Sequence, residues 1–87
     1  KGVVLVDFYA DWCMPCKMLS PILEELSEEI EEKKIVKVNT DKNQELASSF
    51  GIMSIPTLLF VKDGKVIDTL VGMRPKEELE RVIKSYI

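Results

Sequence analysis

No part of the sequence limits the choice of fold as strongly as residues 3–10, which read VVLVDFYA. Both of the alternating faces of this segment are apolar, which is typical of a strand that is buried on both sides. From Cys16 onward the spacing of apolar residues changes from the period of a strand to the period of a helix. A buried strand that leads straight into a long helix predicts an α/β protein, because helices must cover both faces of such a sheet.

The long helix is predicted from a stripe of apolar residues with glutamates on the opposite side. The stripe consists of Leu19, Leu23, Leu26 and Ile30. Residues 35–40 are rich in β-branched side chains and predict a second strand. A short helix is then expected after Asp41 or Asn43 as the N-cap, with Leu46 and Phe50 on one face and Gly51 at its end.

The last third of the chain predicts a hairpin and a final helix. Residues 57–62 and 65–71 are expected to pair as antiparallel strands, because Asp63-Gly64 between them is a strong hairpin signal. Pro75 is a favourable first residue for the closing helix. The predicted buried stripe of that helix consists of Leu79, Val82, Ile83 and Tyr86.

The predicted order is therefore β-α-β-α-β-β-α. Its first half favours a parallel strand pair joined by a helix, and the hairpin adds antiparallel strands. We expect one domain over residues 1–87, an α/β fold with a four-stranded mixed sheet and helices on both faces. Eighty-seven residues leave no room for a second core of ordinary size.

Composition removes several classes of function. The net charge of −3 argues against nucleic acid and acidic lipid surfaces as partners. The longest apolar runs have four residues, which is too short to span a membrane, and no signal-peptide pattern is present. The chain has no histidine, so triads with an imidazole base and the commonest metal ligand are both excluded. Catalysis must then depend on cysteine, carboxylates, lysine or backbone groups.

The chemistry is expected at Cys13 and Cys16, which stand where the first strand ends and the first helix begins. Residues three apart on a helix lie about 5–6 Å apart at Cβ, close enough for a disulfide after small adjustments. The free N–H groups and the dipole at a helix N-terminus stabilise a thiolate. Pro15 between the cysteines suits the first turn. A reactive thiol with a second thiol one turn away is suited to disulfide exchange.

Two structural interpretations of the pair are weaker. A disulfide here closes a loop of four residues. The chain-entropy relation assigns such a loop only about 2 kcal/mol, against nearly 5 kcal/mol for a loop of about 100 residues. A closed zinc site needs four ligands, and one Cys-x-x-Cys pair supplies two. We therefore expect neither a metal nor an added cofactor.

At this point the sequence resembles the thioredoxin family. The resemblance is carried by residues 6–17, which read VDFYADWCMPCK. It is also carried, in the expected order, by Val38-Asn39-Thr40-Asp41, Gly51-Ile52, Ile55-Pro56-Thr57, Asp63-Gly64 and Val71-Gly72. The family usually has Gly-Pro between the cysteines, where this chain has Met14-Pro15. The family also commonly has a strand and a helix ahead of the segment that begins here at Lys1.

The resemblance implies a role for each residue of the predicted active site. Cys13 is expected to be the nucleophile that attacks a target disulfide, and Cys16 the thiol that resolves the mixed disulfide. Asp7 stands in an otherwise apolar strand, and burial raises the pKa of a carboxyl toward the working range of a general base. Lys37 is expected to be the partner of Asp7. The alternative is that Asp7 is only a buried carboxylate satisfied by Lys37, or that Lys37 is a surface lysine of an edge strand.

A shallow apolar surface around the cysteines is expected to receive the target, and Pro56 resembles the cis-proline of the family. We call this surface the target groove; it consists of Trp12, Met14, Pro15, Ile55, Pro56, Val71 and Gly72. If Pro56 is cis, the Ile55 backbone can pair with an extended target chain. Gly72 alternatively serves only to end a strand. Since only about 5% of X–Pro bonds in folded proteins are cis, the sequence alone does not decide this point.

Three methionines are expected at the same end of the fold as Cys13. We call Met14, Met53 and Met73 the methionine rim; the fourth methionine, Met18, belongs to the helix. Methionine side chains are flexible and polarizable, which suits a surface that accepts many partners. The alternative is chance placement combined with packing.

The sequence therefore predicts a protein-disulfide reductase that carries electrons to disulfide-bearing target proteins. The family resemblance implies a thioredoxin reductase or a similar electron donor, a cytoplasmic location and a monomer. A second interpretation is an oxidant or isomerase of an exported compartment, which Met14 between the cysteines keeps open. A third is a binding subunit whose thiols are incidental. The Trp-Cys-x-Pro-Cys segment together with Asp7 argues against the third interpretation.

Overall fold

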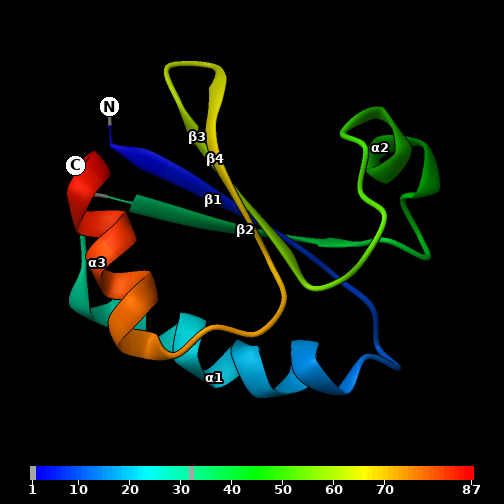
Figure 1. Ribbon diagram of the computed structural model, residues 1–87, viewed down its shortest axis with the longest axis horizontal. Coiled ribbons are helices and arrows are strands. Elements are labelled where there is room, and N and C mark those ends of the chain that lie inside the picture. Colours follow the sequence, from blue (N-terminus) through cyan, green and yellow to red (C-terminus); the bar gives the residue numbers. More distant parts are fainter. Residues whose placement is uncertain (1, 32) are drawn as a thin grey trace.

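The computed structural model describes residues 2–31 and 33–87 and has the predicted order of elements. The strands are β1 (Val3–Tyr9), β2 (Lys33–Asn39), β3 (Thr57–Lys62) and β4 (Lys65–Val71). The helices are α1 (Met14–Glu29), α2 (Gln44–Ser49) and α3 (Lys76–Tyr86). The order β-α-β-α-β-β-α is thus confirmed, and Figure 1 shows how these elements are arranged.

The four strands form one mixed sheet in the order β2-β1-β3-β4. β1 pairs parallel with β2 and antiparallel with β3, and β3 pairs antiparallel with β4. The two apolar strands, β1 and β3, therefore occupy the centre, where both faces of a strand are covered. The predicted four-stranded mixed sheet is confirmed.

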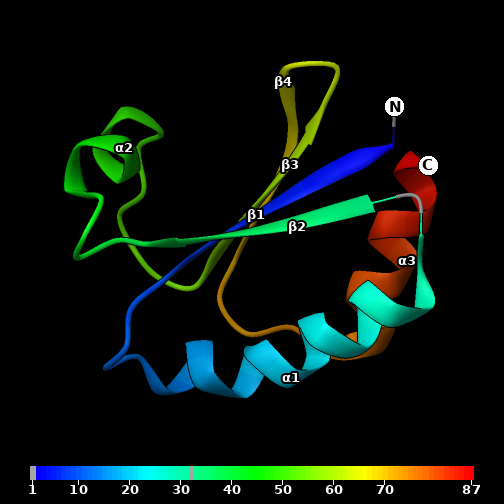
Figure 2. The same ribbon diagram turned by 180° about the vertical axis from the view of Figure 1, so that it is seen from behind.

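Helices lie on both faces of the sheet (Figures 1 and 2). α1 and α3 lie together on one face, where their apolar stripes pack against Leu5, Leu58 and Phe60. On the other face Ala47 of α2 packs in a smaller cluster with Phe8. Because side chains alternate along a strand, β1 directs Leu5 and Asp7 toward α1 and directs Phe8 toward α2.

Two details of the predicted elements are corrected by the structure. α1 begins at Met14, earlier than the apolar period at Cys16 indicates, because Cys13 is its N-cap and Pro15 lies in its first turn. β2 begins at Lys33, because the lysines at its start pair with β1 along the edge of the sheet.

Leu46 and Phe50 are both more than 40% exposed, and the buried residue of α2 is Ala47. The Phe50 ring still contacts the sheet face, with its centroid 6.0 Å from that of Phe8. The small side chain of Ala47 thus faces the core, while the larger side chains of Leu46 and Phe50 lie partly in solvent.

The hairpin between β3 and β4 follows the sequence prediction. Lys62 pairs with Lys65, and the two residues between them have positive φ angles of 55° (Asp63) and 78° (Gly64). Both central residues of a type I′ turn need positive φ, and Asp-Gly accepts this conformation most readily.

No helix within residues 2–31 and 33–87 has the length and the apolar character that a membrane span requires.

Candidate active site

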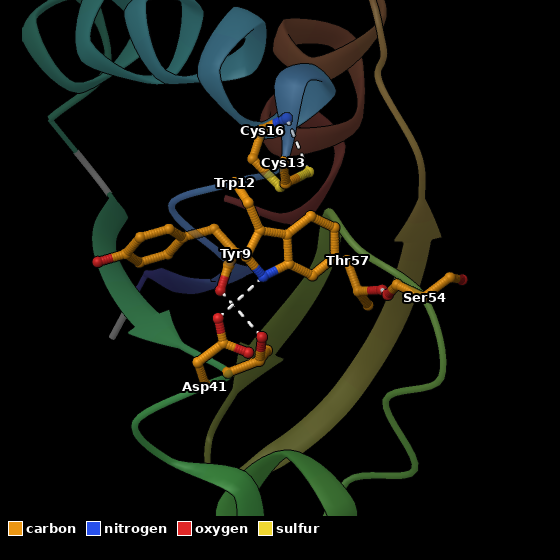
Figure 3. The surroundings of a disulfide bond; sticks show 8 residues. Tyr9, Trp12, Cys13, Cys16, Asp41, Ser54 and Thr57 are labelled. Atoms are coloured by element: carbon orange, nitrogen blue, oxygen red, sulfur yellow. Dashed lines mark hydrogen bonds between the residues drawn. A yellow bond between two sulfur atoms is a disulfide. The ribbon is translucent and has the colours of Figure 1, made fainter.

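The two cysteines lie at the carboxyl end of β1, where α1 begins (Figure 3). They form a disulfide with their Cα atoms 5.2 Å apart, and each residue is less than 10% exposed. The backbone N–H of Cys16 donates a hydrogen bond to Sγ of Cys13 over 3.2 Å. Cys13 Sγ thus occupies the position that a capping side-chain oxygen usually takes.

This capping geometry makes Cys13 the better site for a thiolate. The helix dipole and the free N–H groups of its first turn favour negative charge at the cap. A negative sulfur at Cys13 also accepts the Cys16 N–H more strongly than a neutral one, because hydrogen bonds to charged acceptors are stronger. Cys16 lies inside the first turn and receives less of this stabilisation.

Trp12 covers the approach to the disulfide and is itself 69% exposed. Its indole N–H donates to Oδ2 of Asp41 over 2.9 Å, so the ring is held between the cysteines and the end of β2 (Figure 3). In the sequence Asp41 stands out only as a possible helix cap and as part of a family motif, and neither predicts this contact. The position of Asp41 just after β2 could have indicated it. β2 is parallel to β1, and the carboxyl ends of parallel strands lie at the same edge of a sheet.

The loop before β3 and the end of β4 meet on the other side of the disulfide. The Ile55–Pro56 peptide bond is cis, and Ile55 packs against the cluster that contains both cysteines. Gly72 has a φ of 93°, and its N–H donates to the Pro56 carbonyl over 2.8 Å. Val71 pairs with Thr57 and is 48% exposed. The residues predicted for the target groove therefore lie around one end of the sheet.

A cavity with a volume of about 390 Å³ opens beside this end of the sheet. Its walls include Trp12, Met53 and Ile55, with Ala47 of α2 at the back. Met14 and Pro15 lie outside it, exposed at the start of α1.

Asp7 lies behind the disulfide and is only 3% exposed. It lines a second cavity, of about 150 Å³, together with Cys16, Ser20 and Lys37. We call this space the Asp7 cavity. Oδ1 of Asp7 has no hydrogen-bond partner among the residues that the structure describes. Burial raises the pKa of the Asp7 carboxyl from 3.8 to about 6, and the positive charge of Lys37 opposes part of this rise.

Lys37 stands beside Asp7 in the register of β1 and β2, but its ammonium is bonded elsewhere. Nζ of Lys37 donates to Oγ of Ser20 over 2.8 Å and lies 5.8 Å from the centre of the Tyr9 ring. None of the ion pairs within residues 2–31 and 33–87 involves Asp7. Lys37 therefore acts on Asp7 through space, and the sequence reasoning missed Ser20.

The model of one protein family, Thioredoxin, matches residues 1–85 of this chain. The chain belongs to the thioredoxin family. A curated thioredoxin of Listeria monocytogenes is 57% identical over an alignment of 88 positions, which covers all of this chain and 85% of that protein. The thioredoxin of Bacillus subtilis is 54% identical with the same coverage.

Solved thioredoxin structures have the same fold. A mutant thioredoxin from Halobacterium salinarum superposes with a TM-score of 0.94 at 43% identity, over 99% of this chain and 75% of that one. The thioredoxin of Fasciola hepatica gives 0.92 at 36% identity, over 99% of this chain and 82% of that one. As a thioredoxin-family member with this cysteine pair, the chain is a protein-disulfide oxidoreductase that works by dithiol–disulfide exchange.

The methionines of this thioredoxin-family chain are unusually accessible for apolar side chains. The exposed fractions are 65% for Met14, 96% for Met53 and 38% for Met73. Met14 adjoins Cys13, Met53 lines the cavity beside Trp12, and Met73 follows Gly72. Met18 is 58% exposed on α1 and lies one turn further from the disulfide.

A thioredoxin-type exchange needs only its own two sulfurs as the redox group. Within residues 2–31 and 33–87, no three cysteine, aspartate or glutamate side chains gather closely enough to hold a metal ion.

Proposed function

We propose that this chain, folded as a single domain over residues 1–87, reduces disulfides of target proteins. In this proposal it is a monomer in the cytoplasm, is re-reduced by a thioredoxin reductase or a similar donor, and uses no added cofactor. The observation that carries the direction of electron flow is the buried carboxyl of Asp7 in the same cavity as Cys16. A cysteine pair is a strong oxidant when the thiolate of its reduced form is stabilised. The negative charge of a nearby carboxylate disfavours that thiolate, so the reduced pair gives up its electrons more readily.

In the proposed reaction, the thiolate of reduced Cys13 attacks one sulfur of the target disulfide. A bond forms between Cys13 Sγ and the target, and the other target sulfur leaves as a thiolate that takes up a proton. Asp7 then accepts the proton of the Cys16 thiol through water in the Asp7 cavity, which is large enough to hold it.

The resulting Cys16 thiolate attacks Cys13 Sγ and displaces the second target sulfur, which takes up a proton. The products are a target dithiol and the Cys13–Cys16 disulfide, so two electrons and two protons have moved to the target. The target is bound in the target groove, with its chain extended beside the Ile55 backbone. Trp12, held by Asp41, supplies the largest apolar surface of this groove.

The reduction potential tests the direction of the reaction. We expect equilibration in graded glutathione or dithiothreitol buffers, followed by Trp12 fluorescence, to give a value near or below about −250 mV. Thioredoxins lie at about −270 mV, whereas protein disulfide isomerase lies at about −180 mV. A value above roughly −200 mV would replace the proposed reductase by the oxidant or isomerase that Met14 kept open.

The methionine rim is proposed to broaden the range of targets. Replacing Met14, Met53 and Met73 together by glutamine should lower kcat/KM toward several protein disulfides by about tenfold, the equivalent of about 1.4 kcal/mol of lost apolar contact. The rate with a small aromatic disulfide should stay unchanged, because it needs only the cysteines. Met18→Gln, an equally polar change on an exposed methionine of α1, is the matched control. Unchanged rates toward all protein targets would contradict the role of the rim.

A further inference from the structure

Ser20 is the hydrogen-bond acceptor for the ammonium of Lys37. Ser20 sits in the second turn of α1 and is half-buried, facing the edge strand β2. Its Oγ accepts the hydrogen bond from Lys37 Nζ over 2.8 Å. A lysine side chain has a flexible stem of four carbons, and it loses conformational entropy when its ammonium is held in one position. The hydroxyl and the Tyr9 ring together hold it in one place.

That place is the wall of the Asp7 cavity. Asp7 and Lys37 occupy paired positions on adjacent parallel strands, so their side chains leave the same face of the sheet. Ser20 and Cys16 are one turn apart on α1 and line the same cavity from the helix side. The space thus contains the reacting thiol, the buried carboxyl and the anchored ammonium.

Few other charges face Asp7. Lys17 from α1 and Asp11 from the β1–α1 connection also line the cavity; like Lys37 both are exposed, and their charges are of opposite sign. On the third side Asp7 pairs with Leu58 of β3, which carries no charge. The groups that titrate or carry charge around the cavity are Asp7, Tyr9, Asp11, Cys16, Lys17 and Lys37. Of the cations in this set, Lys37 is the one that leaves the same face of the sheet as Asp7 and is held by a hydrogen bond to Ser20.

We propose that Ser20 is a positioning residue: its hydroxyl anchors the Lys37 ammonium at the Asp7 cavity, and the anchored charge favours loss of the Asp7 proton. This inference rests on the proposed function in one respect, that Asp7 is the base for Cys16. The alternative is that the Ser20–Lys37 hydrogen bond only joins α1 to β2. In that case its loss changes stability and leaves the titration of Asp7 where it was.

The experiment compares the unsubstituted protein with Ser20→Ala. Alanine removes the hydroxyl and is a good helix former, so α1 is retained. The first readout is the titration of the Asp7 carboxyl, followed by NMR of protein labelled with carbon-13 at its aspartate carboxyls. We expect the midpoint of the titration to rise by about half a pH unit. At pH values below the midpoint, this rise lowers the ionised fraction of the Asp7 carboxyl roughly threefold. An unchanged or lowered midpoint would overturn the proposal.

Four further variants define the origin of the shift. Ser20→Thr keeps the hydroxyl and should restore the original midpoint. Ser27→Ala makes the same change on α1 at an exposed serine away from the cavity, and should leave the midpoint unchanged. In Lys37→Met, which removes the charge, the added Ser20→Ala substitution should produce no further shift. A full additional shift in the double variant would show that Ser20 acts without Lys37 and would overturn the proposal.

The second readout separates this inference from the proposed function. The rate at which Cys16 resolves a preformed mixed disulfide is measured against pH for the same variants. If Asp7 is the base, the midpoint of this profile should move with the carboxyl titration. A carboxyl midpoint that shifts while the rate profile does not would refute Asp7 as the base and leave the positioning by Ser20 intact.

Discussion

Replacing Cys16 by serine is expected to stop turnover while Cys13 still attacks its targets. The mixed disulfide then persists, because the group that displaces the target sulfur is missing. Turnover should fall to less than about one thousandth of the unsubstituted rate, as is usual when one member of a covalent catalytic pair is lost. The reduced variant is mixed with a disulfide-bearing protein and run on a non-reducing gel. The gel should show a covalent complex of the two proteins, and dithiothreitol should separate them by reducing the mixed disulfide.

Cys13→Ser is the matched control for this experiment. It should form far less complex, because Cys16 lies inside the first turn and lacks the stabilisation found at the cap. An equal yield of complex from both variants would contradict the assignment of Cys13 as the nucleophile. The double variant Cys13→Ser with Cys16→Ser should lose all exchange activity. Full activity in the double variant would instead support a binding subunit whose thiols are incidental.

Replacing Asp7 by asparagine is expected to stabilise the folded protein at pH 8 and not at pH 4. The folded protein binds the Asp7 proton more tightly than the unfolded chain, since burial raises the pKa from 3.8 to about 6. Stability from this group is therefore complete below about pH 4 and is lost as the pH rises through 6. Asparagine stays neutral, so the variant should be more stable by about 2–3 kcal/mol above pH 7.

Urea unfolding of the oxidised protein at pH 4 and pH 8 measures this difference. Glu28→Gln, which removes a charge from the exposed face of α1, is the control and should change stability by less than about 0.5 kcal/mol at either pH. The Asp7→Asn variant should also resolve its mixed disulfide about a hundredfold more slowly at neutral pH, because the general base is gone. Equal stabilisation at both pH values would rule out a buried charge as the cause.

The order of the elements and the position of the cysteine pair were predictable, because both depend on local properties of the chain. The spacing of apolar residues in residues 3–10 and in α1 shows which faces of these elements are buried. Asp63-Gly64 predicts a hairpin turn because both residues accept the positive φ angles that the turn requires. The short helix α2 was predictable, but its buried residue was not, because six residues are too few for a reliable apolar stripe. In this short helix Ala47 packs with Phe8 against the sheet, while Leu46 is exposed.

The site divides in the same way. Local patterns were enough to predict that two thiols stand at the start of a helix and that a carboxyl interrupts an apolar strand, since these are relations between near neighbours in the chain. The hydrogen bonds of Trp12 to Asp41 and of Lys37 to Ser20 are visible only in the folded protein. These partners are 29 and 17 residues apart. Which side chains meet across such distances depends on strand register and on how a helix sits on the sheet, and no local pattern encodes either.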